Sequence, residues 1–439
     1  MGLSAVLGRL AAGAPVPVFA IAGAGAREAV QDLRLRPELR VLDAPGPAAI
    51  LLIAGELPEV AAQPLGRIHD ALAHPRATVL WSVHRQAHPA LDGVVHPVVV
   101  DGDPVAAIIS TFRDLVAGRR ATEPAVLHDV EPAPWRGLGP YGQGGSGMTG
   151  GTPYGRPMAE LGPDPDGLRL DVLPVDVGPF FPRFPTGLVL DAKFAGDVLL
   201  EAGIMDSFAD GRVPTARPGL QPFLRALKEP VPIAELELAR ARDHLRWLAD
   251  ALRAQGLPAL GLRALRLASA VQPGDGRFVE RLRGLVERSQ VLRWSVGGVG
   301  RTGRDDLAGL GAGPVARAAG LAEDLRSEDP VYLALGFKPI LGDGGDAAAR
   351  WRLRLGEAAQ SLELAARAGP ARTGQVGRVE SPRGRLEPAG GPSERILGII
   401  PDLLRETEWG DAVATLVSLD LDLEESALAR QSQPTEAVA

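Results

Sequence analysis

A glycine- and proline-rich stretch near residues 122–165 constrains the fold more than any other feature of this sequence. It holds few apolar residues and includes the runs 139–147 and 150–157. A stretch of this composition predicts a boundary between two folded units, because it cannot form a core of its own. The length of 439 residues agrees, since single cores stop growing at about 250–300 residues. We expect domains at 1–120 and 167–425, a linker at 121–166 and a flexible tail at 426–439.

The glycines of the linker have two interpretations. Glycine runs most often provide flexibility, which favours a connecting segment. A small-molecule site is the alternative, although no Gly-Lys-Ser/Thr ends the run and no apolar strand directly precedes it. A phosphate-binding loop is therefore not predicted.

Cysteine is absent from these 439 residues. The chain therefore supplies no thiolate to an iron-sulfur cluster, a nickel-iron centre or a cysteine-ligated zinc, and we predict no metal site. Scattered basic residues and a net charge of -7 disfavour a nucleic-acid partner. No apolar run approaches the roughly 20 residues that cross a bilayer, and the start carries no signal-peptide pattern. We expect a cytoplasmic location, with membrane contact only through partners.

The first domain alternates short apolar runs with amphipathic stretches. Apolar runs at 16–21, 40–43, 48–54, 78–83 and 94–101 predict buried strands, and helical spacing at 26–33, 60–73 and 104–117 predicts helices. This alternation predicts an α/β fold with a doubly wound, flavodoxin-like parallel sheet.

The second domain reads as α+β and mainly helical. Residues 168–177 and 187–200 predict two strands. Apolar stripes predict helices at 233–254, 278–291 and 346–366, and the chain closes with the apolar segment 412–419 and an acidic, frayed tail from 424.

The second domain resembles the quinone-site subunit of complex I, the D-type subunit, which is related to the large subunits of nickel-iron hydrogenases. The segment Val177-Gly178-Pro179-Phe180-Phe181-Pro182 resembles the family's Gly-Pro-x-His-Pro loop, and Glu237, Arg240 and His244 resemble its Glu-x-x-Arg-x-x-Asn-His helix, with Asp243 for the Asn. Further resemblances follow in the family's order at 298–300, 313–320, 324–326, 345–361, 380–384, 410–411 and 418–420, the last resembling a terminal strand. A collinear series is far more specific than any single short motif.

The first domain is similar, more loosely, to the B-type subunit of complex I, which carries the terminal iron-sulfur cluster. The similarity runs through residues 48–55, 64–70 and 98–104. In that family paired cysteines lie near the segment occupied here by residues 22–25, and the last cysteine lies near Asp103. None of these positions offers a thiolate.

The resemblance implies a quinone cavity whose residues have changed here. The family's quinone headgroup is bound by a histidine in the Gly-Pro-x-His-Pro loop, where this chain has Phe181, which can donate neither a hydrogen bond nor a proton. Glu237, Arg240, His244 and Phe181 are the positions that would line the altered cavity. The alternative for His244 is a structural role, as a helix histidine paired with Asp243 or Glu237.

Other charged residues favour structural roles. Arg317, Arg326, Arg350, Arg354 and Arg383 resemble family arginines, and we favour ion pairs with Asp324, Asp346, Glu357 or Glu380. Of the first-domain histidines at 69, 74, 84, 88 and 96, His84 and His88 have i, i+4 spacing, but Pro89 follows and a chance pair is the better interpretation.

Two functional hypotheses from different classes remain beside the small-molecule site. The first is a non-redox subunit without catalytic residues or a cofactor of its own, in a complex I-like or group 4 hydrogenase-like assembly with antiporter-like membrane subunits as partners. The second is an NADH-quinone oxidoreductase component, of a family associated with NAD, whose modified cavity still binds quinone within the complex.

Overall fold

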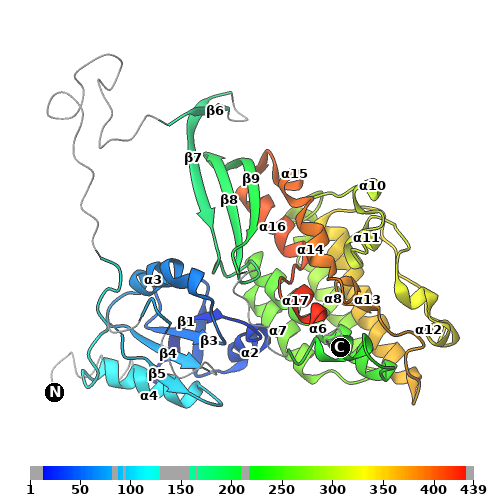
Figure 1. Ribbon diagram of the computed structural model, residues 1–439, viewed down its shortest axis with the longest axis horizontal. Helices are drawn as coiled ribbons and strands as arrows, with labels where there is room; N and C mark the ends of the chain where they lie inside the picture. Colours follow the sequence, from blue (N-terminus) through cyan, green and yellow to red (C-terminus); the bar gives the residue numbers. More distant parts are fainter. Residues whose placement is uncertain are drawn as a thin grey trace, which may run out of the picture.

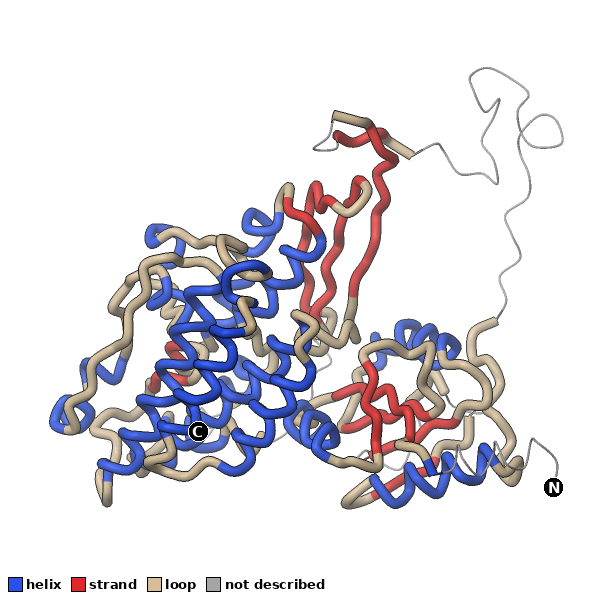
Figure 2. The backbone as a smooth tube through the Cα atoms, turned by 180° about the vertical axis from the view of Figure 1, so that it is seen from behind, coloured by secondary structure: helices blue, strands red, loops and turns tan. Residues whose placement is uncertain are grey.

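The computed structural model describes residues 13–81, 88–91, 95–128, 159–163, 167–208 and 217–431. Figure 1 shows an α/β domain in blue and cyan beside a larger helical domain, with an antiparallel sheet that projects above the contact between them. The view from behind in Figure 2 separates the two groups of strands. The predicted pairing of an α/β domain with a mainly helical one is confirmed.

The first domain is built on a parallel sheet with the strand order β2-β1-β3-β4-β5. Every residue of the central strand β3 is buried, as expected when helices cover both faces of a parallel sheet. Leu65 of α3 packs on one face and Ile108 of α4 on the other. The elements are β1 (Val16–Ala22), α2 (Arg27–Asp32), β2 (Leu39–Leu42), β3 (Ile50–Ala54), α3 (Ala62–Ala71), β4 (Ala77–Trp81), β5 (Val98–Val100) and α4 (Val105–Val116).

The described ends of the predicted linker belong to the folded units. Glu123 is buried and accepts hydrogen bonds from the backbone and hydroxyl of Thr78, at 2.9 and 2.7 Å. The Leu127 N–H donates to Asp70 at 2.9 Å. At the other end Leu161–Pro163 forms β6 and pairs with β7. The linker prediction is therefore wrong for these flanks, while residues 129–158, with the glycine-rich runs, lie outside the described residues.

The second domain begins with an antiparallel sheet in the order β12-β9-β8-β7-β6. Its strands are β6 (Leu161–Pro163), β7 (Arg169–Val177), β8 (Leu188–Ala195), β9 (Val198–Asp206) and β12 (Thr407–Glu408). The prediction of a single strand over 187–200 is wrong, because Gly196, with φ of 61°, turns the chain between β8 and β9. Positive φ favours glycine, which has no Cβ to clash.

Helix α6 (Ile233–Ala254) is the axis of the helical domain, and its bounds match the prediction. The prediction over 278–291 is wrong at its end, because Gln290 adopts φ of 61° and separates α8 from α9. The remaining elements are α5 (Gln221–Ala226), α7 (Pro258–Ala270), α8 (Gly276–Arg288), α9 (Val291–Trp294), α10 (Arg304–Leu307), α11 (Pro314–Ala318), α12 (Pro330–Ala334), α13 (Ala347–Ala368), β10 (Val379–Ser381), β11 (Gly384–Leu386), α14 (Pro392–Leu397), α15 (Ile400–Leu404), α16 (Trp409–Leu419) and α17 (Glu425–Arg430).

The end of the second domain differs from both expectations for it. The segment 418–420, expected as a strand, is the end of helix α16, and Asp420 follows in a left-handed conformation. The frayed tail is also wrong for residues 424–431, because α17 forms there and buries Glu425, Leu428 and Ala429. Within the part of the chain that the structure describes, no helix combines the length and hydropathy needed to cross a bilayer.

The core of the helical domain centres on two tryptophans. Trp351 of α13 is 1% exposed and meets Trp247 of α6 edge to face, with ring centroids 5.6 Å apart. An edge-to-face pair gains energy beyond the area that it buries. These rings therefore fix the contact between the two longest helices.

Replacement of Trp351 with alanine should destabilise the protein by about 3–5 kcal/mol, because the lost ring leaves a cavity in the core. Urea unfolding followed by circular dichroism measures this change. Trp294→Ala is the matched control, since Trp294 is 74% exposed and should shift stability by less than about 0.5 kcal/mol. Equal effects of the two substitutions would contradict this account of the core.

Candidate functional site

The three ionisable residues predicted on α6 lie on one buried face of that helix. Glu237, Arg240 and His244 are at most 1% exposed, and their i, i+3 and i+7 spacing aligns them along the helix. This face packs against α13, which contributes Arg354 and Glu357. The structure thus brings these three residues into a network of buried charges.

Glu237 is held by three donors. The Arg240 and Arg326 guanidiniums lie 3.3 Å from its carboxylate, and the Tyr332 hydroxyl donates to it at 2.8 Å. Burial would raise the pKa of Glu237, but the two arginines hold it below the ordinary value. Glu237 is therefore an ionised, fully occupied acceptor.

His244 has a different partner from the one expected. Its Nε2 lies 3.3 Å from Glu357 Oε2, and its Nδ1 lies 3.3 Å from Arg354 Nη1, so the expected pairing with Asp243 or Glu237 is wrong. Burial lowers the pKa of His244 to about 4, although Glu357 opposes the shift. The ring is neutral at pH 7.

Arg317 is the most heavily paired cation of this network. Its guanidinium lies 2.6 Å from Glu357, 2.7 Å from Glu380 and 3.0 Å from Asp324. Burial would lower its pKa, but the carboxylates raise it above the ordinary value. Arg326 also pairs with Asp324, at 2.8 Å. The predicted ion pairs of Arg317 and Arg326 are confirmed.

The other predicted ion pairs are wrong in their partners. Arg354 lies 3.1 Å from Asp420, and Arg383 lies 3.2 Å from Asp243. The described carboxylates give Arg350 no ion pair; it donates to the carbonyls of Gly300 and Gly345 at 2.7 and 2.9 Å. Burial accordingly lowers the pKa of Arg350 to about 9.

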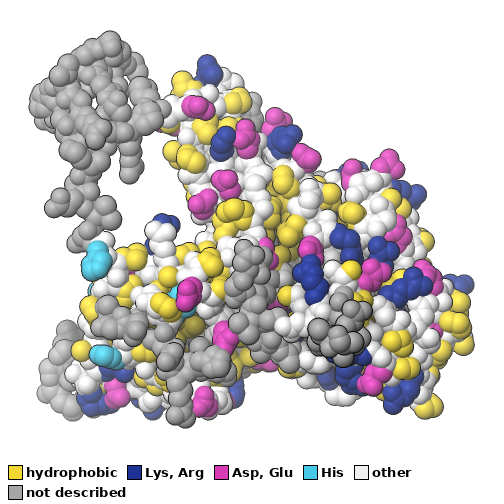
Figure 3. All heavy atoms as spheres, viewed as in Figure 1, with side chains coloured by type: hydrophobic (Ala, Val, Ile, Leu, Met, Phe, Trp, Pro, Cys, Tyr) yellow, Lys and Arg dark blue, Asp and Glu magenta, His cyan; other side chains and the backbone are white. Residues whose placement is uncertain are grey.

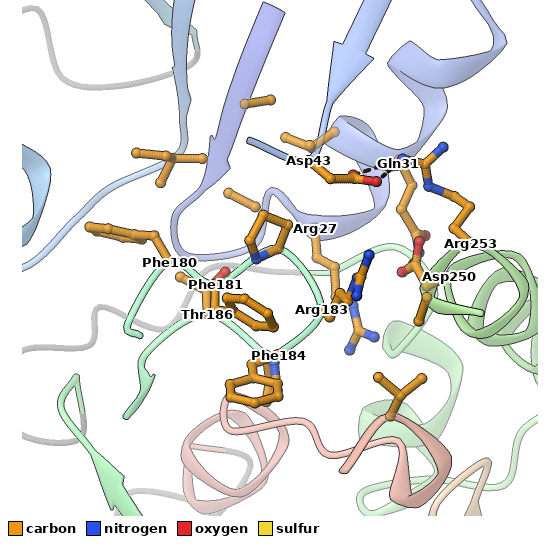
Figure 4. A pocket seen from close by; sticks show the side chains of 18 of the residues that line it. Arg27, Gln31, Asp43, Phe180, Phe181, Arg183, Phe184, Thr186, Asp250 and Arg253 are labelled. Carbon is orange, nitrogen blue, oxygen red and sulfur yellow. Dashed lines mark hydrogen bonds and ion pairs between the residues drawn. The ribbon is translucent and has the colours of Figure 1, made fainter. Parts of the chain in front are cut away.

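Phe181 lies apart from this network, in a cavity between the two domains (Figure 4). The cavity has a volume of about 120 Å³. Phe181 packs against Phe184 and Trp409, with ring centroids 4.7 and 5.8 Å away. Glu237, Arg240 and His244 do not line this cavity, so the structure does not bring the four predicted positions into one site.

Polar contacts of α6 and the first domain lie at one end of the cavity. Arg253 lies 2.7 Å and Arg34 lies 3.1 Å from the Asp43 carboxylate, and Gln31 donates to Asp250. Arg246 also crosses to the first domain, 2.8 Å from Asp32. One face of α6 therefore makes ion pairs inside the helical domain, and another makes ion pairs with the first domain.

The turn after β1, where the sequence resemblance to the B-type subunit would place paired cysteines, is covered by other parts of this chain. A Cβ added to Gly23 would lie 2.3 Å from the Glu56 carbonyl oxygen, so the backbone leaves no room for any side chain there. Glu424, from the far end of the sequence, accepts from the Gly25 N–H at 3.3 Å. Asp103, the other position of that resemblance, caps α4 by accepting from the Val105 N–H at 3.1 Å.

Several residues of this interface were missed in the sequence. Arg217 pairs with Asp422 and lies 3.7 Å from Glu28, which joins the last acidic segment to α2. The alternation of leucine and acidic residues at 419–424 is the signal that could have identified a half-buried segment.

The first-domain histidines show no metal arrangement among the described residues. His69 lies 2.8 Å from Asp70 and 3.3 Å from Glu123, and His88 contacts the Pro58 carbonyl at 3.0 Å. His84 lies outside the described residues. Across the part of the chain that the structure describes, no group of three or more potential ligands could hold a metal ion.

Comparison with known proteins places the helical domain. Residues 276–388 match the family described as the respiratory-chain NADH dehydrogenase 49 kDa subunit. The helical domain is therefore similar to the D-type subunit of complex I. The chain is 30% identical over 159 residues to the second D-type subunit of NADH-quinone oxidoreductase from Sinorhizobium medicae, and 28% identical over 188 residues to the D-type subunit from Clostridium beijerinckii.

These matches are partial. Each covers 35% of this chain, and they cover 39% and 50% of the two relatives. Among solved structures, a chain of the membrane-bound sulfane sulfur reductase, an archaeal respiratory membrane complex, aligns with a TM-score of 0.40 and 18% identity. That alignment covers 58% of this chain and 98% of the other.

His244→Asn should reduce the loss of stability that the protein suffers in acid. The pKa of His244 is about 4 when folded and 6.5 ordinarily, so the unfolded state binds the proton more readily between these values. The contribution is complete above pH 6.5 and falls by up to about 1.4 kcal/mol per pH unit below it. Urea unfolding from pH 7 to 4 measures the slope, and equal slopes for variant and parent would contradict this assignment.

Glu425→Gln provides a control of opposite sign. Burial raises the pKa of Glu425 from 4.5 to about 7, with Arg383 opposing and Asp422 adding to the shift. Its contribution is therefore complete below pH 4.5 and is lost as the pH rises to 7. The substitution should flatten that loss and leave the His244 component unchanged.

Proposed function

We propose that this chain is a non-redox subunit of a complex I-like or group 4 hydrogenase-like membrane-associated assembly. It acts there as a structural or coupling platform for other complex I-like or antiporter-like membrane subunits. Its location is cytoplasmic and peripheral to the membrane, reached through those partners. The similarity of the helical domain to D-type subunits supports membership, since the relatives named above are subunits of NADH-quinone oxidoreductases.

The turn after β1 carries the non-redox part of the proposal. If the first domain is of the B type, its cluster would require soft ligands close to residues 22–25. The backbone at Gly23 packs directly against the backbone of Glu56, and the Glu424 carboxylate accepts a hydrogen bond from the Gly25 N–H. An acidic carboxylate therefore occupies a place where the related fold needs thiolates, and these 439 residues offer none.

The buried charge network supports a platform role in addition. Glu237, Arg240 and Arg317 are each bound by groups of the same chain. Removing one member would leave an unpaired buried charge, which costs about 3–5 kcal/mol. The stability of the fold therefore requires these buried charges whether or not the chain takes part in electron transfer.

The test combines the purified full chain with membranes of its source. After incubation with iron and sulfide, the protein should show neither visible absorbance nor, once reduced, a paramagnetic resonance signal. In detergent-solubilised membranes, native electrophoresis should place the chain in a complex much larger than itself. A reducible cluster would overturn the non-redox part, and a chain found only as a free species would overturn the platform part.

A second candidate is a D-type component whose modified cavity still binds quinone. The cavity lined by Phe181 and Phe184 is the observation that favours it. Photolabelling of the intact complex with an azidoquinone, followed by peptide mapping, should then label the loop 178–186. Absence of label there, in a complex that labels elsewhere, would exclude this candidate.

A further inference from the structure

The interdomain cavity contains two guanidiniums that face the same space from different domains. Arg27 comes from α2 of the first domain, and Arg183 comes from the loop that precedes β8. Figure 4 shows both side chains projecting into the same part of the cavity, beside Phe181 and Phe184. Like charges brought together in this way repel unless an anion lies between them.

Arg183 has no ion-pair partner among the described residues, and Arg27 has one, a long contact that it shares with other cations. No described carboxylate lies within ion-pair distance of Arg183, and its side chain makes no hydrogen bond to any described residue. Arg27 lies 3.7 Å from Asp420, but Asp420 is closer to Arg354, at 3.1 Å, and to Arg383, at 3.4 Å. Arg383 also pairs with Asp243, at 3.2 Å, and Arg27 donates to the Leu421 carbonyl at 3.5 Å. Of the three cations around Asp420, Arg27 makes the longest contact.

At the opposite end of the cavity the charged side chains have partners. Arg34 and Arg253 both contact Asp43, and Asp250 accepts from Gln31. The excess of positive charge is thus confined to the end that holds Arg27 and Arg183.

Apolar side chains form the wall next to this charge. Phe181, Phe184 and Leu421 line the cavity together with Leu416 and Val417. The described lining includes no histidine or tyrosine, and its one ring donor, the Trp247 indole N–H, already donates to the Val417 carbonyl at 2.8 Å. The site combines a guanidinium pair with a hydrocarbon wall.

We propose that this cavity binds an anionic amphiphile, whose carboxylate or phosphate lies between Arg27 and Arg183 and whose short hydrocarbon portion lies along Phe181 and Phe184. Guanidiniums bind both anions through paired, charge-assisted hydrogen bonds. The inference rests on the cavity itself and not on membership of an assembly. It also differs from the second candidate above, since a quinone carries no charge.

Calorimetric titration of the full chain tests the proposal with octanoate and octyl phosphate as probes. Both should bind at one site, and Arg183→Gln should weaken them about tenfold or more, the usual effect of losing a hydrogen bond to a charged group. Arg183 makes no contact that folding needs, so this variant should remain folded. Arg266→Gln, which changes an exposed arginine on α7, is the matched control and should bind as the parent does.

Neutral probes and vesicles complete the experiment. Octanol binding as tightly as octanoate, or octanoate binding that Arg183→Gln leaves unchanged, would overturn the proposal. Tight binding of decylubiquinone without octanoate binding would also overturn it, in favour of the quinone candidate. Sedimentation with phosphatidylglycerol vesicles that depends on Arg183 would identify a lipid headgroup as the anion, whereas octanoate binding without sedimentation would identify a free amphiphile.

Discussion

The contact between Arg317 and Glu357, with Nε and Oε1 2.6 Å apart, is the interaction on which the helical domain depends. Burying either charge alone is costly, so the pair holds α11 and α13 at a fixed separation. Glu357 also lies next to His244 of α6. Glu380 of β10 pairs with the same Arg317 guanidinium. The ion pairs of Arg317 therefore hold together elements that are far apart in the sequence.

Helix α6 connects this charge network to the first domain. Its inner face carries Glu237 and His244, while Arg246 and Arg253 reach across to Asp32 and Asp43. The face shown in Figure 3 has basic and acidic side chains interspersed over the helical domain. The ion pairs around Arg317 are instead buried, where a low dielectric strengthens each of them.

Periodicity in the sequence was enough to predict α6, α13 and the parallel strands, because these elements carry long, regular apolar patterns. Local conformations were not predictable: Gly196 and Gln290 end elements through positive φ, which apolar patterns do not encode. The site was predicted in part. Spacing placed Glu237, Arg240 and His244 on one face, but the cavity of Phe181 depends on a partner domain, and Asp420 was recognised only as part of a terminal motif, without its partners.

The contact between Glu424 and Gly25 joins residues that are 399 positions apart. The first domain can form its parallel sheet early in translation, since the contacts within that sheet are local by comparison. Its β1–α2 turn, however, lacks its acidic cover until the ribosome has passed Glu424. A chain that ends before that residue therefore leaves the Gly25 N–H of this turn without its carboxylate acceptor.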